Sequence, residues 1–228
     1  MPGTSQGNSS LLTSTGAPSS QLHGGCNKEL SFLHVLSFKT LELYARDFVE
    51  TSIKKDINPE RVWMQSFNPP DIFQWLKEYP AFGRQAVYLD ESGDTPENYT
   101  AAVALLPSLK KKGVNIISPP INYLLQEAGP NDQIIVPAPD AIAAKRVGLD
   151  IITWTFESSG PLAGVKVDED YYYTSIQNAT HTDGQLYEVL NILAQEAGIK
   201  GIFSDWSAMV TYYANWFGLS GPNANDYK

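Results

Sequence analysis

The sequence is poor in the residues that cross-link small proteins or bind metal ions. Among 228 residues there are one cysteine, Cys26, and three histidines, His23, His34 and His181. A single cysteine excludes an intrachain disulfide, so burial and hydrogen bonding must hold the fold together. The cysteine count alone leaves the compartment open.

Positive charge is also scarce. The chain has 16 lysines and arginines against 25 aspartates and glutamates, which gives a formal net charge of −9. Proteins that bind nucleic acids neutralise phosphates with clustered basic residues, so this balance argues against a nucleic-acid partner. The one basic run, Lys110-Lys111-Lys112, is predicted to end a helix, where cations complement the helix dipole.

Long apolar runs are missing as well. No stretch approaches the roughly 20 residues of a membrane-spanning helix, and the N-terminus lacks the basic start and apolar run of a secretory signal. As written, the sequence predicts a cytoplasmic chain without a membrane span. Three glycosylation sequons, which begin at Asn8, Asn98 and Asn178, would matter if intact relatives are secreted, so the true compartment stays open.

The chain divides into a polar head and one domain. Residues 1–27 are rich in Ser, Thr, Gly and Pro without apolar periodicity, which predicts a disordered segment. Residues 28–228 are expected to form the folded part. It opens with apolar residues at three- and four-residue steps, which predict a helix that ends before Pro59: Leu41, Tyr44, Ala45, Phe48, Val49 and Ile53.

After this helix, short apolar runs alternate with amphipathic stretches, as in βα units around a parallel sheet. The predicted strands are Val62–Phe67, Gln85–Asp90, Val114–Ser118, Asp150–Glu157 and Gly201–Asp205. The predicted helices are Asp71–Lys77, Ala101–Lys112, Pro139–Val147 and Gly184–Ala197, with Gly113, Gly148 and Gly198 at left-handed caps. A last helix follows Asp205, with either Met209, Tyr213 and Trp216 or Val210 and Phe217 facing inward.

Functional residues of such folds sit at the carboxyl ends of the strands. This rule selects Gln65–Phe67, Tyr88–Glu91, Trp154, Glu157 and Asp205–Trp206. Five of these residues are predicted to form the wall of a substrate pocket: Gln65, Phe67, Tyr88, Trp154 and Glu157. A packed core tryptophan explains Trp154 equally well, and Phe67 and Tyr88 carry the same ambiguity. Asp205 also ends a strand, but an aspartate that opens a helix is as well explained as an N-cap.

These strand blocks resemble those of glycerophosphodiester phosphodiesterases, in the same order along the chain. The blocks are Arg61-Val-Trp-Met-Gln-Ser-Phe67, Pro80-Ala-Phe-Gly-Arg-Gln-Ala-Val-Tyr-Leu-Asp90, Gly148-Leu-Asp-Ile-Ile-Thr-Trp-Thr-Phe-Glu157, Gly201-Ile-Phe-Ser-Asp-Trp206 and Val210-Thr-Tyr-Tyr-Ala-Asn215. The resemblance implies a partial TIM-type (βα) barrel of the phospholipase-C-like phosphodiesterase fold that lacks its N-terminal strands. Ser158 and Ser207 depart from it, because we expect an arginine and a proline there.

The resemblance also implies an activity, namely metal-assisted hydrolysis of a glycerophosphodiester to glycerol 3-phosphate and an alcohol. In that family a divalent cation, Ca²⁺ or Mg²⁺, and two histidines act, the first within a His-Arg-Gly motif. This sequence has no His-Arg-Gly, and none of its histidines follows a predicted strand. We therefore predict no catalytic residue, no metal ligand and no hydrolysis of glycerophosphocholine.

Two short segments are similar to motifs of the N-terminal part of that family, which this sequence otherwise lacks. Pro96-Glu-Asn-Tyr-Thr100 is similar to the segment that follows the family's His-Arg-Gly, but it is interpreted as a helix-entry loop. Glu29-Leu30-Ser31 stands where the family has a metal-binding glutamate and is interpreted as a relic at most.

Two hypotheses remain for the chain as it stands. It is either an inactive member of this enzyme family, or a noncatalytic binding or regulatory protein that keeps an aromatic half-pocket. Half a barrel leaves its outer strands unpaired, which predicts poor solubility or self-association through open edges, including a dimer that rebuilds the ring.

Overall fold

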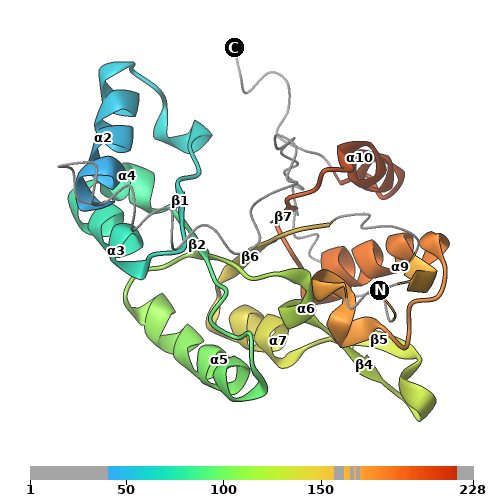
Figure 1. Cartoon of the computed structure of the whole chain (residues 1–228). Coiled ribbons are helices and arrows are strands. Elements are labelled where there is room, and N and C mark those ends of the chain that lie inside the picture. Colours follow the sequence, from blue (N-terminus) through green and yellow to red (C-terminus); the bar gives the residue numbers. More distant parts are fainter. Residues whose placement is uncertain (1–40, 157–161, 165–166, 168–169, 220–228) are drawn as a thin grey trace, which may run out of the picture.

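The structure is a computed structural model that describes residues 41–156, 162–164, 167 and 170–219. The predicted head, His23, His34, the Glu29-Leu30-Ser31 segment, Glu157 and Ser158 lie outside the described residues. Within them the chain is a mixed α/β protein built on a five-stranded sheet and a separate two-stranded hairpin. Figure 1 shows helices along one side of the sheet and further helices at each of its ends.

All five strands of the main sheet are parallel and follow one another in chain order. They are β1 (Gln65–Ser66), β2 (Val87–Leu89), β3 (Ile116–Ser118), β6 (Asp150–Thr153) and β7 (Gly201–Ile202). Every predicted strand is therefore confirmed, although each is shorter than predicted. The phosphodiesterase barrel remains a prediction, as does self-association through the outer strands β1 and β7.

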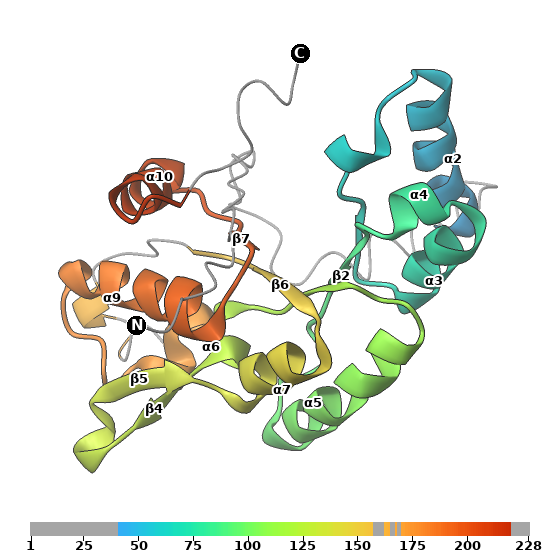
Figure 2. The same ribbon diagram turned by 180° about the vertical axis from the view of Figure 1, so that it is seen from behind.

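The helices fall into three groups (Figures 1 and 2). The first group stands at the β1 end: α2 (Leu41–Lys54), η1 (Pro59–Arg61), α3 (Pro69–Glu78) and α4 (Pro80–Gly83). The second, α5 (Pro96–Lys111), α6 (Ile121–Leu124) and α7 (Pro139–Val147), lies along the sheet. The third lies in the last part of the described chain: η3 (Leu162–Gly164), η4 (Tyr171–Ile176), η5 (Asp183–Gln185), α9 (Leu186–Asn191), η6 (Ile192–Ala197) and α10 (Ser207–Trp216).

The predicted helices all form, with corrected limits. The Pro96–Thr100 segment is the first turn of α5 rather than a loop, because Thr95 caps the helix by accepting a hydrogen bond from Asn98 N. The basic run does end this helix, with Lys112 at the cap. Gly113, Gly148 and Gly198 take φ values of +97°, +75° and +76°, as predicted for left-handed caps.

The last helix corrects two expectations. Its buried face consists of Val210, Tyr213 and Ala214, so Trp216 and Phe217, which we expected to face inward, are exposed. Its N-cap is Trp206 and not Asp205. The entry is fixed instead by Ser204, whose hydroxyl accepts from Trp206 N at 2.9 Å and donates to Phe156 O at 2.6 Å.

An antiparallel hairpin, β4 (Leu125–Ala128) with β5 (Ile134–Pro137), was not predicted. Its turn contains Gly129 and Asn131 at positive φ, and η2 (Pro130–Asp132) lies within it. Glu127 on β4 accepts hydrogen bonds from the backbone and side-chain nitrogens of Asn178. The hairpin is thereby tied to the segment that follows η4.

The main core lies between the sheet and its helices, and the central strand β3 supplies its middle. Ile117 of β3 is fully buried, whereas Ile134 of the hairpin is 51 % exposed. We expect Ile117→Ala to lower the free energy of unfolding by about 3 kcal/mol, since a buried cavity remains, and Ile134→Ala to lower it by less than about 1 kcal/mol. Chemical denaturation of both variants measures this difference, and equal losses would contradict the assignment of the core.

Candidate functional site

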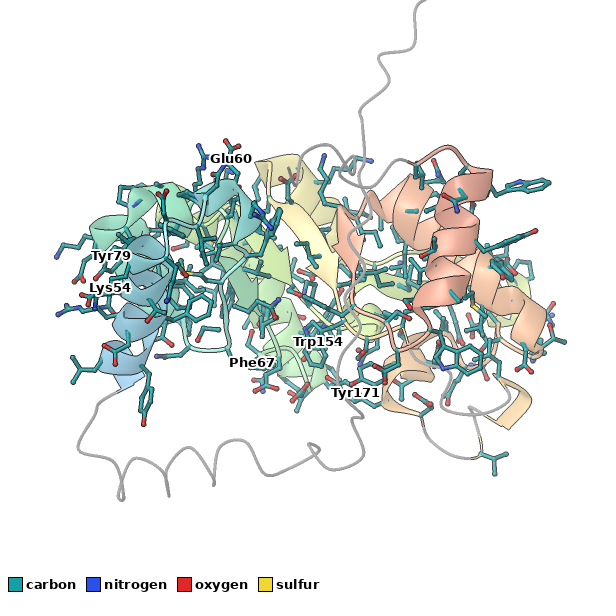
Figure 3. All side chains as sticks on the ribbon, turned by 90° about the horizontal axis from the view of Figure 1, so that it is seen from above. Lys54, Glu60, Phe67, Tyr79, Trp154 and Tyr171 are labelled. Atoms are coloured by element: carbon teal, nitrogen blue, oxygen red, sulfur yellow. The ribbon has the colours of Figure 1, made fainter. Side chains whose placement is uncertain are left out.

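The candidate site lies at the carboxyl edge of the parallel sheet. The loops after β1, β2, β3 and β6 meet there, because the carboxyl ends of parallel strands share one edge. Phe67, Trp154 and Tyr171 lie along this edge in Figure 3, and they come from three distant parts of the chain.

Four rings form a continuous series that we call the aromatic row: Phe67, Trp154, Tyr172 and Tyr171. The Phe67 and Trp154 ring centroids are 5.8 Å apart, those of Trp154 and Tyr172 6.1 Å, and those of Tyr172 and Tyr171 5.2 Å. Each pair meets edge to face, the arrangement that the ring quadrupoles favour. Phe67 remains 43 % exposed, so one end of the row faces solvent.

The backbone holds Trp154 in place. Its indole Nε1 donates to the Ser118 carbonyl at 2.6 Å, and its own carbonyl accepts from Ile121 N at 3.0 Å. The peptide bond from Trp154 to Thr155 is cis. Because these contacts join the loops after β3 and β6, the ring position is set by the sheet.

A second set of bonds positions Phe67 at the end of β1. The hydroxyl of Ser66 donates to Asp71 Oδ2 at 2.7 Å, and Asn68 Nδ2 donates to Asp71 Oδ1 at 3.0 Å. The Ser66 hydroxyl also accepts from Asn68 N at 3.0 Å. This network closes the loop around Phe67 and presents its ring to Trp154.

Ser118 adds a polar atom below the row. Its side chain is fully buried at the end of β3, and its Oγ has no hydrogen-bond partner within the part of the chain that the structure describes. A buried hydroxyl without a partner is uncommon in folded proteins. Its carbonyl accepts from Trp154 Nε1 and from Asp90 N, so Ser118 joins the Trp154 ring to the loop after β2 through its main chain.

An acidic loop after β2 continues the row. Asp94 Oδ1 accepts the hydroxyls of Tyr123 at 2.6 Å and Tyr171 at 2.9 Å. Burial and the bond to Asp94 raise the pKa of Tyr171 to about 12 and that of Tyr123 further. Burial, with Asp94 and Asp90 nearby, raises the pKa of Glu91. Negative charge therefore gathers next to the rings.

A buried carboxyl group lies behind this loop. Asp140, in the first turn of α7, is 3 % exposed, and burial with the nearby charge of Asp90 raises the pKa of its side chain to about 7. Its backbone N donates to Tyr99 Oη, which donates to the Tyr123 carbonyl. Asp90 instead accepts from Ser92 N and Oγ. Asp140 and Asp90 are both buried, and the charge of Asp90 acts on the carboxyl group of Asp140.

The structure brings only two of the five predicted pocket residues together, Phe67 and Trp154. Gln65 is exposed on β1, and Glu157 lies outside the described residues. Tyr88 points to the helix side of the sheet, into a cavity of about 190 Å³ that Asp90 and Phe73 also line. There, burial and a hydrogen bond to Asp90 raise the pKa of its hydroxyl.

Sequence reasoning missed Asp94, Tyr123, Tyr171 and Tyr172. The run Tyr171-Tyr172-Tyr173 was a visible signal, because three consecutive tyrosines in a polar stretch are unusual. The pairing of Tyr171 with Asp94 spans 77 positions, and no local pattern encodes it.

The divalent cation that the resemblance implies does not fit the described residues. Among them, no group of three or more His, Cys, Asp or Glu side chains could hold a metal ion. Asp90 and Asp94 lie close in sequence, but their Oδ1 atoms already accept hydrogen bonds from Ser92 and from two tyrosines. His181 is exposed in the loop before η5.

No helix within the described ranges is long and apolar enough to cross a bilayer.

The fold and this edge define a parallel-sheet α/β protein with an aromatic and acidic surface where the strands end. No family model matches the chain. The chain is 43 % identical over 179 residues to a protein of the fungus Arthroderma benhamiae named "Extracellular protein", in a match that covers 78 % of this chain and 72 % of that protein. The chain therefore belongs to the same family as this fungal extracellular protein.

Proposed function

We propose that the chain is a noncatalytic relative of the glycerophosphodiester phosphodiesterases that binds the glycerol part of a small phosphodiester at the aromatic row. The observation that carries the proposal is the fixed Trp154 ring between Phe67 and Tyr172, next to the acidic loop. The lineage itself rests on the resemblance of the strand blocks.

The chemistry of the row suits a polyol. Aromatic faces pack against C–H groups, and a few placed polar atoms fix the orientation of a ligand in such sites. The exposed carboxylate of Glu91, which lies close enough to Asp94 to feel its charge, is available to accept hydrogen bonds from alcohol groups. The acidic loop disfavours a free phosphate dianion, which selects the singly charged diester over the monoester.

The proposal separates binding from turnover. Hydrolysis of a phosphodiester needs charge neutralisation and a base near neutral pKa. The sequence has no His-Arg-Gly, and the carboxyl group with a pKa near 7, Asp140, is enclosed in the core. We therefore expect a ligand that binds and is released unchanged.

Isothermal titration calorimetry with glycerophosphoglycerol tests the proposal, because this diester carries no ammonium group. For a ligand of about 15 non-hydrogen atoms we expect a Kd on the order of 0.5 mM. Glycerol 3-phosphate should bind at least about fivefold more weakly, since its second charge meets the acidic loop. Equal affinity for both ligands, or no heat of binding, would refute the proposed site.

The name of the fungal relative also bears on where the chain acts. Together with the sequons at Asn98 and Asn178, it supports the proposal that this protein works outside the cell. Fractionation of the native organism's culture tests this directly: we expect the protein in the medium, and its retention in the cytosol would refute the proposal.

A further inference from the structure

A second surface rich in aromatic residues lies between α9 and α10, which run side by side near the C-terminal end of the described chain (Figures 1 and 2). The two helices border a groove of about 410 Å³, which we call the terminal groove. It is lined by Tyr187, Glu188, Asn191, Tyr212, Tyr213, Trp216 and Phe217. It shares no residue with the aromatic row.

The helix period explains why so many rings share this groove. Tyr212 and Trp216 are four residues apart and therefore share one face of α10. Tyr213 and Phe217 share the neighbouring face for the same reason, and both pairs border the groove. Tyr187 of α9 meets Tyr212 at 6.0 Å between ring centroids, and Tyr213 meets Phe217 at 4.6 Å. The sequence thus assembles five rings from two helices.

Four of these five rings are exposed, whereas Tyr213 is buried. Trp216 is 76 % exposed and Tyr212 is 60 % exposed, although core packing would favour burial of both. Tyr213 is held in place by two hydrogen bonds, because its Oη donates to Asn191 Oδ1 at 3.0 Å and accepts from Gln195 Nε2 at 3.3 Å. An exposed aromatic surface on a fixed base is typical of a binding site.

The charge at the groove indicates the sign of the ligand's charge. Among the described residues that line the groove, Glu188 is the one ionisable side chain other than tyrosine, and none is a lysine or an arginine. Aromatic faces carry the negative part of the ring quadrupole, so the rings and the carboxylate favour the same sign of ligand. The chain's net charge of −9 adds to this field.

We propose that the terminal groove binds an alkylammonium cation, such as a quaternary ammonium or methylated amine group, between Tyr187, Tyr212 and Trp216. Its methyl groups would contact the rings, and Glu188 would neutralise the charge. A neutral sugar fits the lining less well, because Glu188 and Asn191 are the polar residues besides the tyrosines, and the Asn191 oxygen is already occupied by Tyr213.

An NMR titration of the full chain with choline tests this proposal. We expect saturable shifts of the Trp216 indole signal, which is identified by its loss in Trp216→Phe. The uncharged isostere 3,3-dimethylbutan-1-ol should bind about fivefold more weakly, because it lacks the cation. Trp216→Ala should weaken choline binding by at least about tenfold and Glu188→Gln by about fivefold.

Matched variants exclude general effects. Phe48→Ala removes an exposed ring on α2, and Glu97→Gln removes an exposed carboxylate on α5; both variants should bind choline like the wild type. The proposal is overturned if the isostere binds as well as choline, or if methyl glucoside alone saturates the groove. It is also overturned if choline does not bind, and light scattering of the wild type and Trp216→Ala then shows whether a dimer covers the groove instead. Glycerophosphoglycerol binding at the aromatic row is independent of every one of these outcomes.

Discussion

Replacement of Trp154 by alanine is expected to abolish measurable binding of glycerophosphoglycerol. The ring contacts both Phe67 and Tyr172, and its Nε1 donates to the Ser118 carbonyl, so the change removes the middle of the aromatic row. Loss of the stacking surface should weaken binding by at least about tenfold. The protein should also lose about 2–4 kcal/mol of unfolding free energy, since Trp154 is partly buried.

A second variant separates binding from stability. Trp154→Phe keeps a ring but removes the bond to Ser118, so we expect a loss of about 1 kcal/mol in stability and a Kd within about threefold of the wild type. Trp206→Ala, at an exposed tryptophan after β7, serves as the matched control and should bind normally. If Trp154→Ala folds and binds like the wild type, the aromatic row is not the site.

Replacement of Asp140 by asparagine is expected to stabilise the protein at neutral and alkaline pH. The carboxyl group has its pKa raised to about 7, chiefly by burial and also by Asp90. The folded chain thus retains a proton that the unfolded chain releases at ordinary carboxyl pKa values, and the free energy of unfolding falls as pH rises from about 4 to about 7. The cost of this group at about pH 8 is on the order of 2–4 kcal/mol.

Asparagine has the same shape and no charge, so the variant should recover most of this energy and lose the corresponding pH dependence. Denaturant unfolding at intervals between about pH 4 and pH 8 measures the free energy of unfolding of both proteins. The contributions of other groups cancel in the difference between the variant and the wild type. Glu97→Gln, on an exposed part of α5, should leave the wild-type slope unchanged. A destabilised Asp140→Asn protein at pH 8 would mean that the folded state keeps the carboxylate ionised and paired.

The parallel sheet could be predicted because its strands are buried on both faces. Val87 and Ile117 are fully buried on opposite sides of the sheet, in two different core clusters, so their segments appear as continuous apolar runs. The helix caps at Gly148 and Gly198 were predictable for a local reason, because only a residue without Cβ takes those φ values easily.

The hairpin and most of the site could not be predicted as readily. The hairpin strand Leu125–Ala128 has no clear alternation, and only Gly129 and Pro130 marked its turn. Tyr88 is the middle residue of β2 and Trp154 directly follows β6. Adjacent positions along a strand face opposite sides of a sheet, so proximity to the edge did not place Tyr88 in the row. The bond between Tyr171 and Asp94 depends on tertiary packing alone.

The same limit explains the error in α10. The spacing of Val210, Tyr213 and Phe217 allowed more than one inward face, and the choice depended on where α9 packs. Packing against α9 buries Tyr213 and leaves Trp216 in solvent. That exposed ring is what defines the terminal groove.

Phosphorus NMR of glycerophosphoglycerol in the presence of the protein and Mg²⁺ or Ca²⁺ tests the central claim most directly, because one spectrum reports both binding and hydrolysis. The account predicts a saturable change in the diester signal that Trp154→Ala removes, with no phosphomonoester signal after prolonged incubation. A monoester signal that a chelator suppresses, or a diester signal that the protein leaves unchanged, would contradict it.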